Sequence, residues 1–177
     1  LCKTASTSTR WTAPPPRRTE TRRRLGYSHG DFVIGQIGLL MPRKRPMFLI
    51  NALPEILNLS PNVRVLFVGA ASPGQDSYVA QLQKRAEELK VADRIQWLPF
   101  QHEVADYFAA LDLNVLLSND EGFGRVIIEA GAAGIPTIGS DVGGIPEVIE
   151  DGVTGYVLGP RNCPDEQFDT LTTGFAH

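Results

Sequence analysis

Two glutamates eight positions apart, Glu121 and Glu129, are the residues whose type and spacing most strongly suggest chemistry in this sequence. On a helix they would lie roughly 12 Å apart along the axis, at about 1.5 Å per residue. The paired carboxylates of glycoside hydrolases lie about 5–9.5 Å apart, so this pair does not fit hydrolysis of one glycosidic bond. The spacing instead predicts contacts to opposite ends of one elongated ligand.

Glycines occupy the stretch between the two carboxylates. Gly122 and Gly124 would let a ligand approach the backbone closely, and the amides at the start of the following helix favour an anion. A ligand with a sugar, a central diphosphate and a ribose would fit this layout. Beyond Arg125 the segment is apolar or small except for Glu129, which predicts a buried helix. A carboxylate there needs a partner, either ligand hydroxyls or an internal ion pair with Lys44 or Arg125.

A second candidate site is the run of three cations Arg43, Lys44 and Arg45. The run follows an apolar segment and precedes a helix start, where backbone amides also favour an anion. This placement favours phosphate binding over a solvated charge run. The loop lacks the GxGxxG pattern, which argues against a dinucleotide dehydrogenase. The three histidines show no metal-ligand spacing, and we expect no metal site.

Strands and helices that could position these residues alternate along the chain. Short apolar runs predict buried strands at 32–37, 63–68, 95–98, 113–117, 136–140 and 156–158. Apolar residues at helical spacing predict helices near 48–57, 79–89, 104–111, after 121, and at 145–149. Strands that are apolar throughout predict a parallel sheet covered on both faces. We therefore expect an α/β fold with a doubly wound, mostly parallel, Rossmann-like sheet.

Ligands of such sheets bind beyond the carboxyl ends of the strands. The candidate binding loops are therefore 38–46, 69–75, 98–103, 118–124 and 140–146. Both the cation run and Glu121 fall within them. Asp112 lies between a helix and a strand, and we expect a structural role for it rather than a catalytic one.

The composition is that of an ordinary globular protein. Of the 177 residues, 42% are hydrophobic and 21% are charged. No apolar run approaches the roughly 18 residues of a membrane span, and no signal-peptide pattern opens the chain. Cys2 and Cys163 match no disulfide or metal spacing, which suits a reducing compartment, and we expect a cytoplasmic location.

Charged residues are distributed unevenly along the chain. Residues 1–24 hold seven basic side chains against Glu20 alone, whereas the remainder holds ten basic against nineteen acidic. A basic arm could contact nucleic acid or anionic lipid. Its Ser, Thr and Pro content favours a disordered or linker segment instead, and the acidic body argues against a nucleic-acid partner. We predict one domain over 25–160 and a frayed tail over 161–177.

The segment EGFGRVIIEAGAAGIPTIGSDVGGIPEVIEDGVTGYVLGP closely resembles the E-x7-E region of retaining glycosyltransferases with the GT-B fold, of the family 4 type. DFVIGQIGLLMPRKRP resembles their first donor-domain strand and phosphate loop, and RIQWLPFQHEVADYFAALDLNVLLS resembles their nucleobase-side strand and helix. The resemblance covers roughly residues 25–160. It implies that the chain is the C-terminal, donor-binding half of a GT-B enzyme.

The resemblance also implies roles for the charged residues. Glu129 would accept hydrogen bonds from the ribose hydroxyls, and Glu121 would face the donor sugar in the catalytic centre. Lys44 would contact the donor diphosphate, assisted by Arg43 and Arg45.

Backbone and apolar contacts to the donor are implied as well. Gly122, Phe123 and Gly124 would lie near the sugar and phosphate, and the chain around Leu98 and Phe100 would border the nucleobase. The enzymes that the sequence resembles are usually metal-independent, because protein cations neutralise the leaving diphosphate. No cofactor is expected besides the nucleoside diphosphate sugar, which is the donor substrate.

The sequence departs from the family at Leu39, where arginine is usual, at Pro99, where glycine is common, and in lacking an N-terminal acceptor domain. The function implied is donor binding within a retaining, hexosyl-transferring glycosyltransferase, inactive without that acceptor domain. Any association with a membrane is expected at its surface and only through the complete enzyme. Two alternatives stay open: a stand-alone nucleotide-sugar-binding module without catalysis, and a fragment of a GT-B-fold sugar-nucleotide epimerase.

Overall fold

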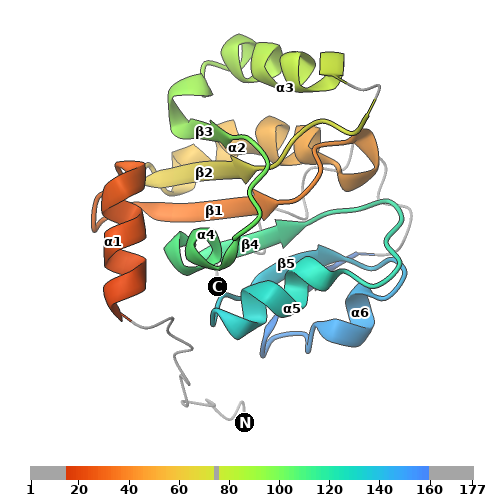
Figure 1. The fold of residues 1–177 in the computed structure, drawn as a ribbon. Helices are drawn as coiled ribbons and strands as arrows, with labels where there is room; N and C mark the ends of the chain where they lie inside the picture. Colours follow the sequence, from red (N-terminus) through yellow and green to blue (C-terminus); the bar gives the residue numbers. More distant parts are fainter. Residues whose placement is uncertain (1–14, 74–75, 160–177) are drawn as a thin grey trace, which may run out of the picture.

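Figure 1 shows the computed structural model of the chain, which describes residues 15–73 and 76–159. The strands of this part are β1 (Phe32–Ile37), β2 (Val63–Val68), β3 (Ile95–Leu98), β4 (Leu113–Leu116), β5 (Thr137–Ser140) and β6 (Gly155–Leu158). Its helices are α1 (Pro15–Leu25), η1 (Pro42–Lys44), α2 (Pro46–Leu59), α3 (Asp76–Glu88), η2 (Ala92–Arg94), α4 (Ala105–Ala110), α5 (Arg125–Ala132) and α6 (Ile145–Val148). The predictions for residues 1–14 and 161–177, with Cys2 and Cys163, lie outside the described residues.

All six strands form one parallel sheet in the order β3-β2-β1-β4-β5-β6. This confirms the doubly wound, Rossmann-like α/β fold predicted from the alternation of apolar strands and helices. The chain winds outward from β1 to β3, returns to place β4 beside β1, and then winds outward to β6 (Figure 1). The reversal between β1 and β4 is where such sheets bind ligands, at the carboxyl ends of the strands.

Helices cover both faces of the sheet. On one face Ile34 of β1 belongs to a core cluster that includes Leu53 of α2 and Leu82 of α3. On the other face Val33 of β1 clusters with Phe108 of α4. Because successive strand residues point to opposite faces, a strand buried on both sides is apolar throughout. The apolar strand sequences therefore follow directly from this two-sided packing.

Residues 15–24 form most of helix α1, so the expectation of a disordered or linker segment is wrong there; α1 packs against α4 beside the sheet (Figure 1). That expectation treated the arginines as solvated, but the structure gives them partners. Arg17 pairs with Asp106 (Nε–Oδ1, 3.1 Å), and the Arg24 guanidinium lies 5.7 Å from the centre of the Tyr107 ring. The basic helix is therefore part of the folded domain.

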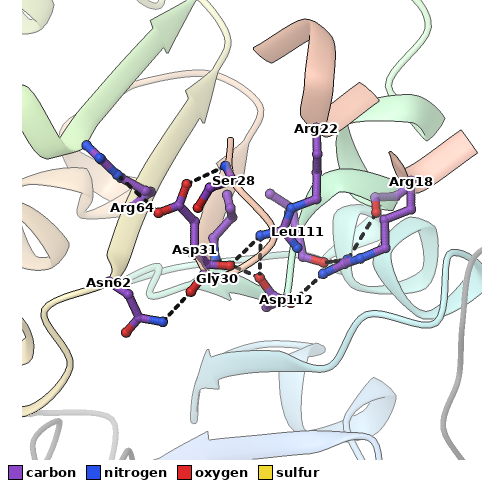
Figure 2. Close-up of polar contacts among 11 residues, drawn as sticks. Arg18, Arg22, Ser28, Gly30, Asp31, Asn62, Arg64, Leu111 and Asp112 are labelled. Atoms are coloured by element: carbon purple, nitrogen blue, oxygen red, sulfur yellow. Dashed lines mark hydrogen bonds and ion pairs between the residues drawn. The ribbon is translucent and has the colours of Figure 1, made fainter. Parts of the chain in front are cut away.

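Figure 2 shows how α1 is tied to the amino-terminal edge of the sheet through Asp112, which precedes β4. Its carboxylate accepts hydrogen bonds from Arg18 (2.5 Å), Arg22 (3.3 Å) and the amide of Val33 (2.7 Å). Arg22 also donates to the carbonyl of Asp31, just before β1. This edge is opposite the candidate binding loops, which agrees with the structural role expected for Asp112.

Candidate functional site

Two loops meet at the reversal between β1 and β4. The first leads from β1 through η1 into α2 and carries Lys44, whereas the second leads from β4 to α5 and carries Glu121. The Lys44 amine lies 4.0 Å from Oε2 of Glu121, and the two side chains are only 17% and 14% exposed. The fold therefore brings together Lys44 and Glu121, which belong to two separate candidate sites in the sequence.

The Glu121 carboxylate has a second, hydroxyl partner. Ser118, a fully buried residue that follows β4, donates from Oγ to the same Oε2 atom over 3.2 Å. Ser140, at the end of β5, donates in turn to the carbonyl of Ser118 over 2.6 Å. The carboxylate is thus held from the sheet itself, because both serines lie at carboxyl ends of neighbouring strands.

Further hydrogen bonds join the two loops. The Arg43 guanidinium donates to the carbonyl of Asp120 (2.5 Å), and the amide of Asn119 donates to the carbonyl of Arg43 (2.8 Å). Gln36, in β1, donates from its side-chain amide to the carbonyl of Lys44 over 2.9 Å. Arg43 therefore links the loops in addition to lying beside Lys44 in sequence. Arg45 is the N-cap of α2 and has a φ of 48°, and its amide donates to the carbonyl of Pro42 in η1.

A third loop, between β5 and α6, lies against the Glu121 loop. Gly143 has a φ of +52°, and a Cβ placed there would lie 1.7 Å from the Glu121 carbonyl oxygen. The Gly144 amide donates to that same carbonyl over 3.3 Å, and a Cβ at Gly144 would lie 2.7 Å from the Gly122 carbonyl oxygen. The close approach requires residues without side chains at both positions.

The predicted backbone contacts Gly122, Phe123 and Gly124 lie immediately before α5. Gly124 is the N-cap of that helix, with φ 72°, and is buried. Phe123 is 55% exposed, and no atom lies within 4 Å of a Cβ placed on Gly122. The two residues ahead of the N-cap are therefore open at the ligand edge of the sheet.

Helix α5 differs from its predicted burial. Ile128 is 47% exposed and the Glu129 side chain is 41% exposed. The prediction of a buried helix is therefore wrong for this face of α5. The Glu129 carboxylate lies 3.8 Å from the Arg125 guanidinium, one turn earlier on the helix. Of the two internal partners that the sequence left open, the structure selects Arg125, since Lys44 pairs with Glu121 instead.

The two residues predicted at the nucleobase differ in environment. Leu98 is half-buried and packs against the core, and its carbonyl accepts a hydrogen bond from the Gly69 amide (2.9 Å). Phe100 is 58% exposed, with its ring edge-on to that of His102 at 5.0 Å between centroids. The exposed aromatic side chain of this pair is therefore Phe100, whereas Leu98 belongs to the packed side of the sheet.

Sequence reasoning missed three polar residues that support this site, Gln36, Ser118 and Ser140. Gln36 and Ser118 are 3% and 0% exposed. The signal that could have identified them is a polar side chain inside or at the end of an otherwise apolar strand, because a buried polar group needs a hydrogen-bond partner.

Within residues 15–73 and 76–159, no three His, Cys, Asp or Glu side chains gather closely enough to hold a metal ion. The same part of the chain contains no helix with the length and apolar character needed to cross a membrane. The groups available at the ligand edge are a lysine, carboxylates, hydroxyls, backbone amides and an exposed aromatic ring. Such a set suits a polar, anionic organic ligand.

The sequence model of the family described as "Glycosyl transferases group 1" matches residues 17–171. This chain belongs to that family. The D-inositol 3-phosphate glycosyltransferase of Segniliparus rotundus is 35% identical to this group 1 domain over 146 residues, which are 81% of this chain and 32% of that protein. Its counterpart in Nocardia farcinica is 34% identical over 155 residues, 85% of this chain and 34% of that protein. The chain thus spans about a third of the length of the curated relatives that it matches.

Solved structures show the same architecture. HepE of Anabaena, crystallised with UDP and glucose, superimposes on 92% of this group 1 domain and 42% of its own chain, with a TM-score of 0.80 and 31% identity. The C-terminal domain of the group 1 protein LpcC of Francisella tularensis matches over 95% of this chain and 86% of that domain, with a TM-score of 0.77 and 23% identity. These matches confirm the resemblance to the C-terminal half of a GT-B glycosyltransferase.

Proposed function

We propose that this domain binds a nucleoside diphosphate sugar at the carboxyl edge of its sheet. We also propose that the enzyme of which it forms part transfers the glycosyl unit to an acceptor with retention of anomeric configuration. The observation that carries the proposal is the Lys44–Glu121 pair, which lies where the strand order reverses between β1 and β4. Ser118 donates a hydrogen bond to the Glu121 carboxylate of this pair. The family membership and the UDP bound by the HepE neighbour support a uridine nucleotide as the first ligand to test.

Lys44 is the residue proposed to neutralise the donor diphosphate. When the bond between the sugar C1 and the diphosphate oxygen breaks, its electron pair stays on the diphosphate, and a preorganised cation lowers the energy of that charge. Arg43 and Arg45 would assist from either side, although Arg43 also holds the Asp120 carbonyl. We propose metal-independent transfer because Lys44 would supply the positive charge that balances the leaving diphosphate.

The other contacts follow from what each residue exposes. Glu129, on the open side of α5, would accept hydrogen bonds from the ribose hydroxyls and share its charge with Arg125. Glu121 would face the sugar, with the backbone of Gly122, Phe123 and Gly124 beside the sugar and phosphate.

The base would rest against the exposed Phe100 ring, with the chain at Leu98 bordering it, because stacking on an aromatic face stabilises a base with little dependence on its identity. The sequence gives no preference among uracil, guanine and adenine. No cofactor besides the donor is proposed, and the cytoplasmic location stays a prediction from the sequence.

Isothermal titration of UDP and UDP-glucose into the chain and its Lys44→Ala variant tests the proposal. Loss of a charge-assisted contact should weaken both ligands by about 10- to 100-fold. Lys84, a 77% exposed lysine on α3, provides the matched control, and Lys84→Ala should bind as the parent does. Equal affinity of Lys44→Ala and the parent would place the phosphate site elsewhere.

Glycosyl transfer should be absent with the chain alone, because an acceptor-holding wall that excludes water is then missing. Transfer that appears only when an acceptor domain is supplied supports the enzyme over a stand-alone binding module. Interconversion of the donor to its epimer would favour the epimerase alternative instead.

A further inference from the structure

Gln36 is a buried polar residue near the carboxyl end of the otherwise apolar strand β1, and its side chain reaches the backbone of Lys44. It is 3% exposed, and its Nε2 donates to the Lys44 carbonyl over 2.9 Å. We propose that Gln36 is a positioning residue that sets where the Lys44 ammonium lies in the donor site. This inference rests on the proposed role of Lys44 in binding the diphosphate.

The bonded carbonyl belongs to a junction that needs support. Lys44 is the last residue of η1, and the next residue, Arg45, adopts the left-handed conformation (φ 48°) from which α2 begins. That conformation is unfavourable for a residue with a Cβ, so surrounding contacts must hold it. Gln36 supplies such a contact directly from β1, which pairs with a strand on each side and is a rigid part of the fold.

The position of the ammonium depends on that junction. Its nitrogen lies 4.0 Å from Glu121 and would lie 3.4 Å from a Cβ placed on Gly38, so it sits over the end of β1. A lysine is a point charge on a flexible stem, and fixing its backbone removes part of the freedom that binding would otherwise have to restrict. Gln36 fixes the backbone end of Lys44, while Glu121 holds the charged end.

The chemistry of position 36 also calls for an explanation. Its neighbours in β1 are Phe32, Val33, Ile34, Gly35 and Ile37. An amide buried among them is unfavourable unless it is hydrogen-bonded, and an apolar residue of similar shape would fill the same space. The Lys44 carbonyl provides a hydrogen-bond acceptor for the Nε2 group of this amide.

The decisive experiment compares Gln36→Met with Thr137→Val. Methionine matches glutamine in length but cannot donate a hydrogen bond. Thr137 is 1% exposed and bonded to Asn114 (3.1 Å) at the amino end of β5, away from the loops, so its valine variant also removes one buried hydrogen bond. Gln36→Met should weaken UDP binding about fivefold, whereas Thr137→Val should change it less than twofold.

Hydrogen exchange gives a readout that needs no ligand. The amides of Lys44 and Arg45 donate to the carbonyls of Met41 and Pro42 within the η1 turn. They should exchange faster in Gln36→Met than in the parent, and not in Thr137→Val. If Gln36→Met fails to fold, Gln36→Asn retains the amide on a shorter stem and should show the same two effects.

Combining variants separates this inference from the proposed function. If Gln36 acts through Lys44, adding Gln36→Met to Lys44→Ala should cause no further loss of UDP affinity. An additional fivefold loss in that background, or unchanged exchange and affinity in Gln36→Met, would overturn the positioning role while Lys44→Ala still defined the site. If Lys44→Ala binds UDP as the parent does, the proposed function and the positioning role both fail, and exchange then reports only on the turn.

Discussion

Replacing Gly143 by alanine tests whether the loop between β5 and α6 holds the backbone of Glu121 in place. The new Cβ would lie 1.7 Å from the Glu121 carbonyl oxygen, so the two loops would have to separate. Overpacking of this kind lowers the free energy of unfolding by about 1–3 kcal/mol. The left-handed conformation of Gly143 adds about 1–2 kcal/mol for a residue with a Cβ. The expected total loss is therefore about 2–5 kcal/mol.

Gly152 provides the matched control, because it has a φ of +74° but no atom within 4 Å of a Cβ placed there. Gly152→Ala should lose only the conformational part, about 1–2 kcal/mol. Urea unfolding of both variants gives the difference, and UDP-glucose titration should show weaker binding for Gly143→Ala alone, because Glu121, which is proposed to face the sugar, moves. Equal loss of stability in the two variants, with unchanged UDP-glucose affinity, would refute the idea that this loop supports the site.

Asp112→Ala should lower the free energy of unfolding by about 2–4 kcal/mol, because the 10% exposed Arg22 side chain then loses this carboxylate. Urea unfolding checks this against Asp93→Ala, whose ion pair is exposed; equal losses would contradict it. The Tyr27 hydroxyl is buried with no partner among the described residues, and burial raises its pKa. The folded state thus favours the neutral phenol. The contribution of this preference to the free energy of unfolding is complete below pH about 10 and is lost as the pH rises. Tyr27→Phe should keep stability at pH 7 and reduce the alkaline loss, unlike the exposed control Tyr156→Phe; an unchanged alkaline slope would count against this.

The regular elements could be predicted because burial leaves a local trace in the sequence. The run from Phe32 to Ile37 is apolar except for Gln36 because both of its faces are covered, and that pattern is present in the residues themselves. The same holds for α2, whose buried residues recur at helical spacing. Parallel strands joined by helices allow few arrangements, so the fold and the candidate ligand edge could be predicted from these local patterns.

The partners of charged residues could not be predicted in this way. For Glu129 the sequence left Lys44 and Arg125 open, and spacing along α5 could not choose between them. Lys44 pairs instead with Glu121, which lies on a loop that follows another strand. Only the relative placement of two strands determines such a pair.

Helix α1 illustrates the same limit. The composition of residues 1–24 predicted a disordered or linker segment, because composition does not show whether acceptors for the arginines lie within reach. In the folded chain Arg18 and Arg22 meet Asp112, some ninety positions away. A cluster of like charges is unfavourable alone and favourable once opposite charges face it.

The sequence by itself determined the periodic elements of the sheet, its parallel arrangement and the family, and it predicted the candidate binding loops. The tertiary structure alone decided that Lys44 faces Glu121, that Gln36 holds the Lys44 backbone and that Gly143 lies against Glu121. The physical reason is one of range. Hydrophobic periodicity is a property of neighbouring residues, whereas hydrogen bonds and ion pairs form between atoms that only folding brings within about 3–4 Å.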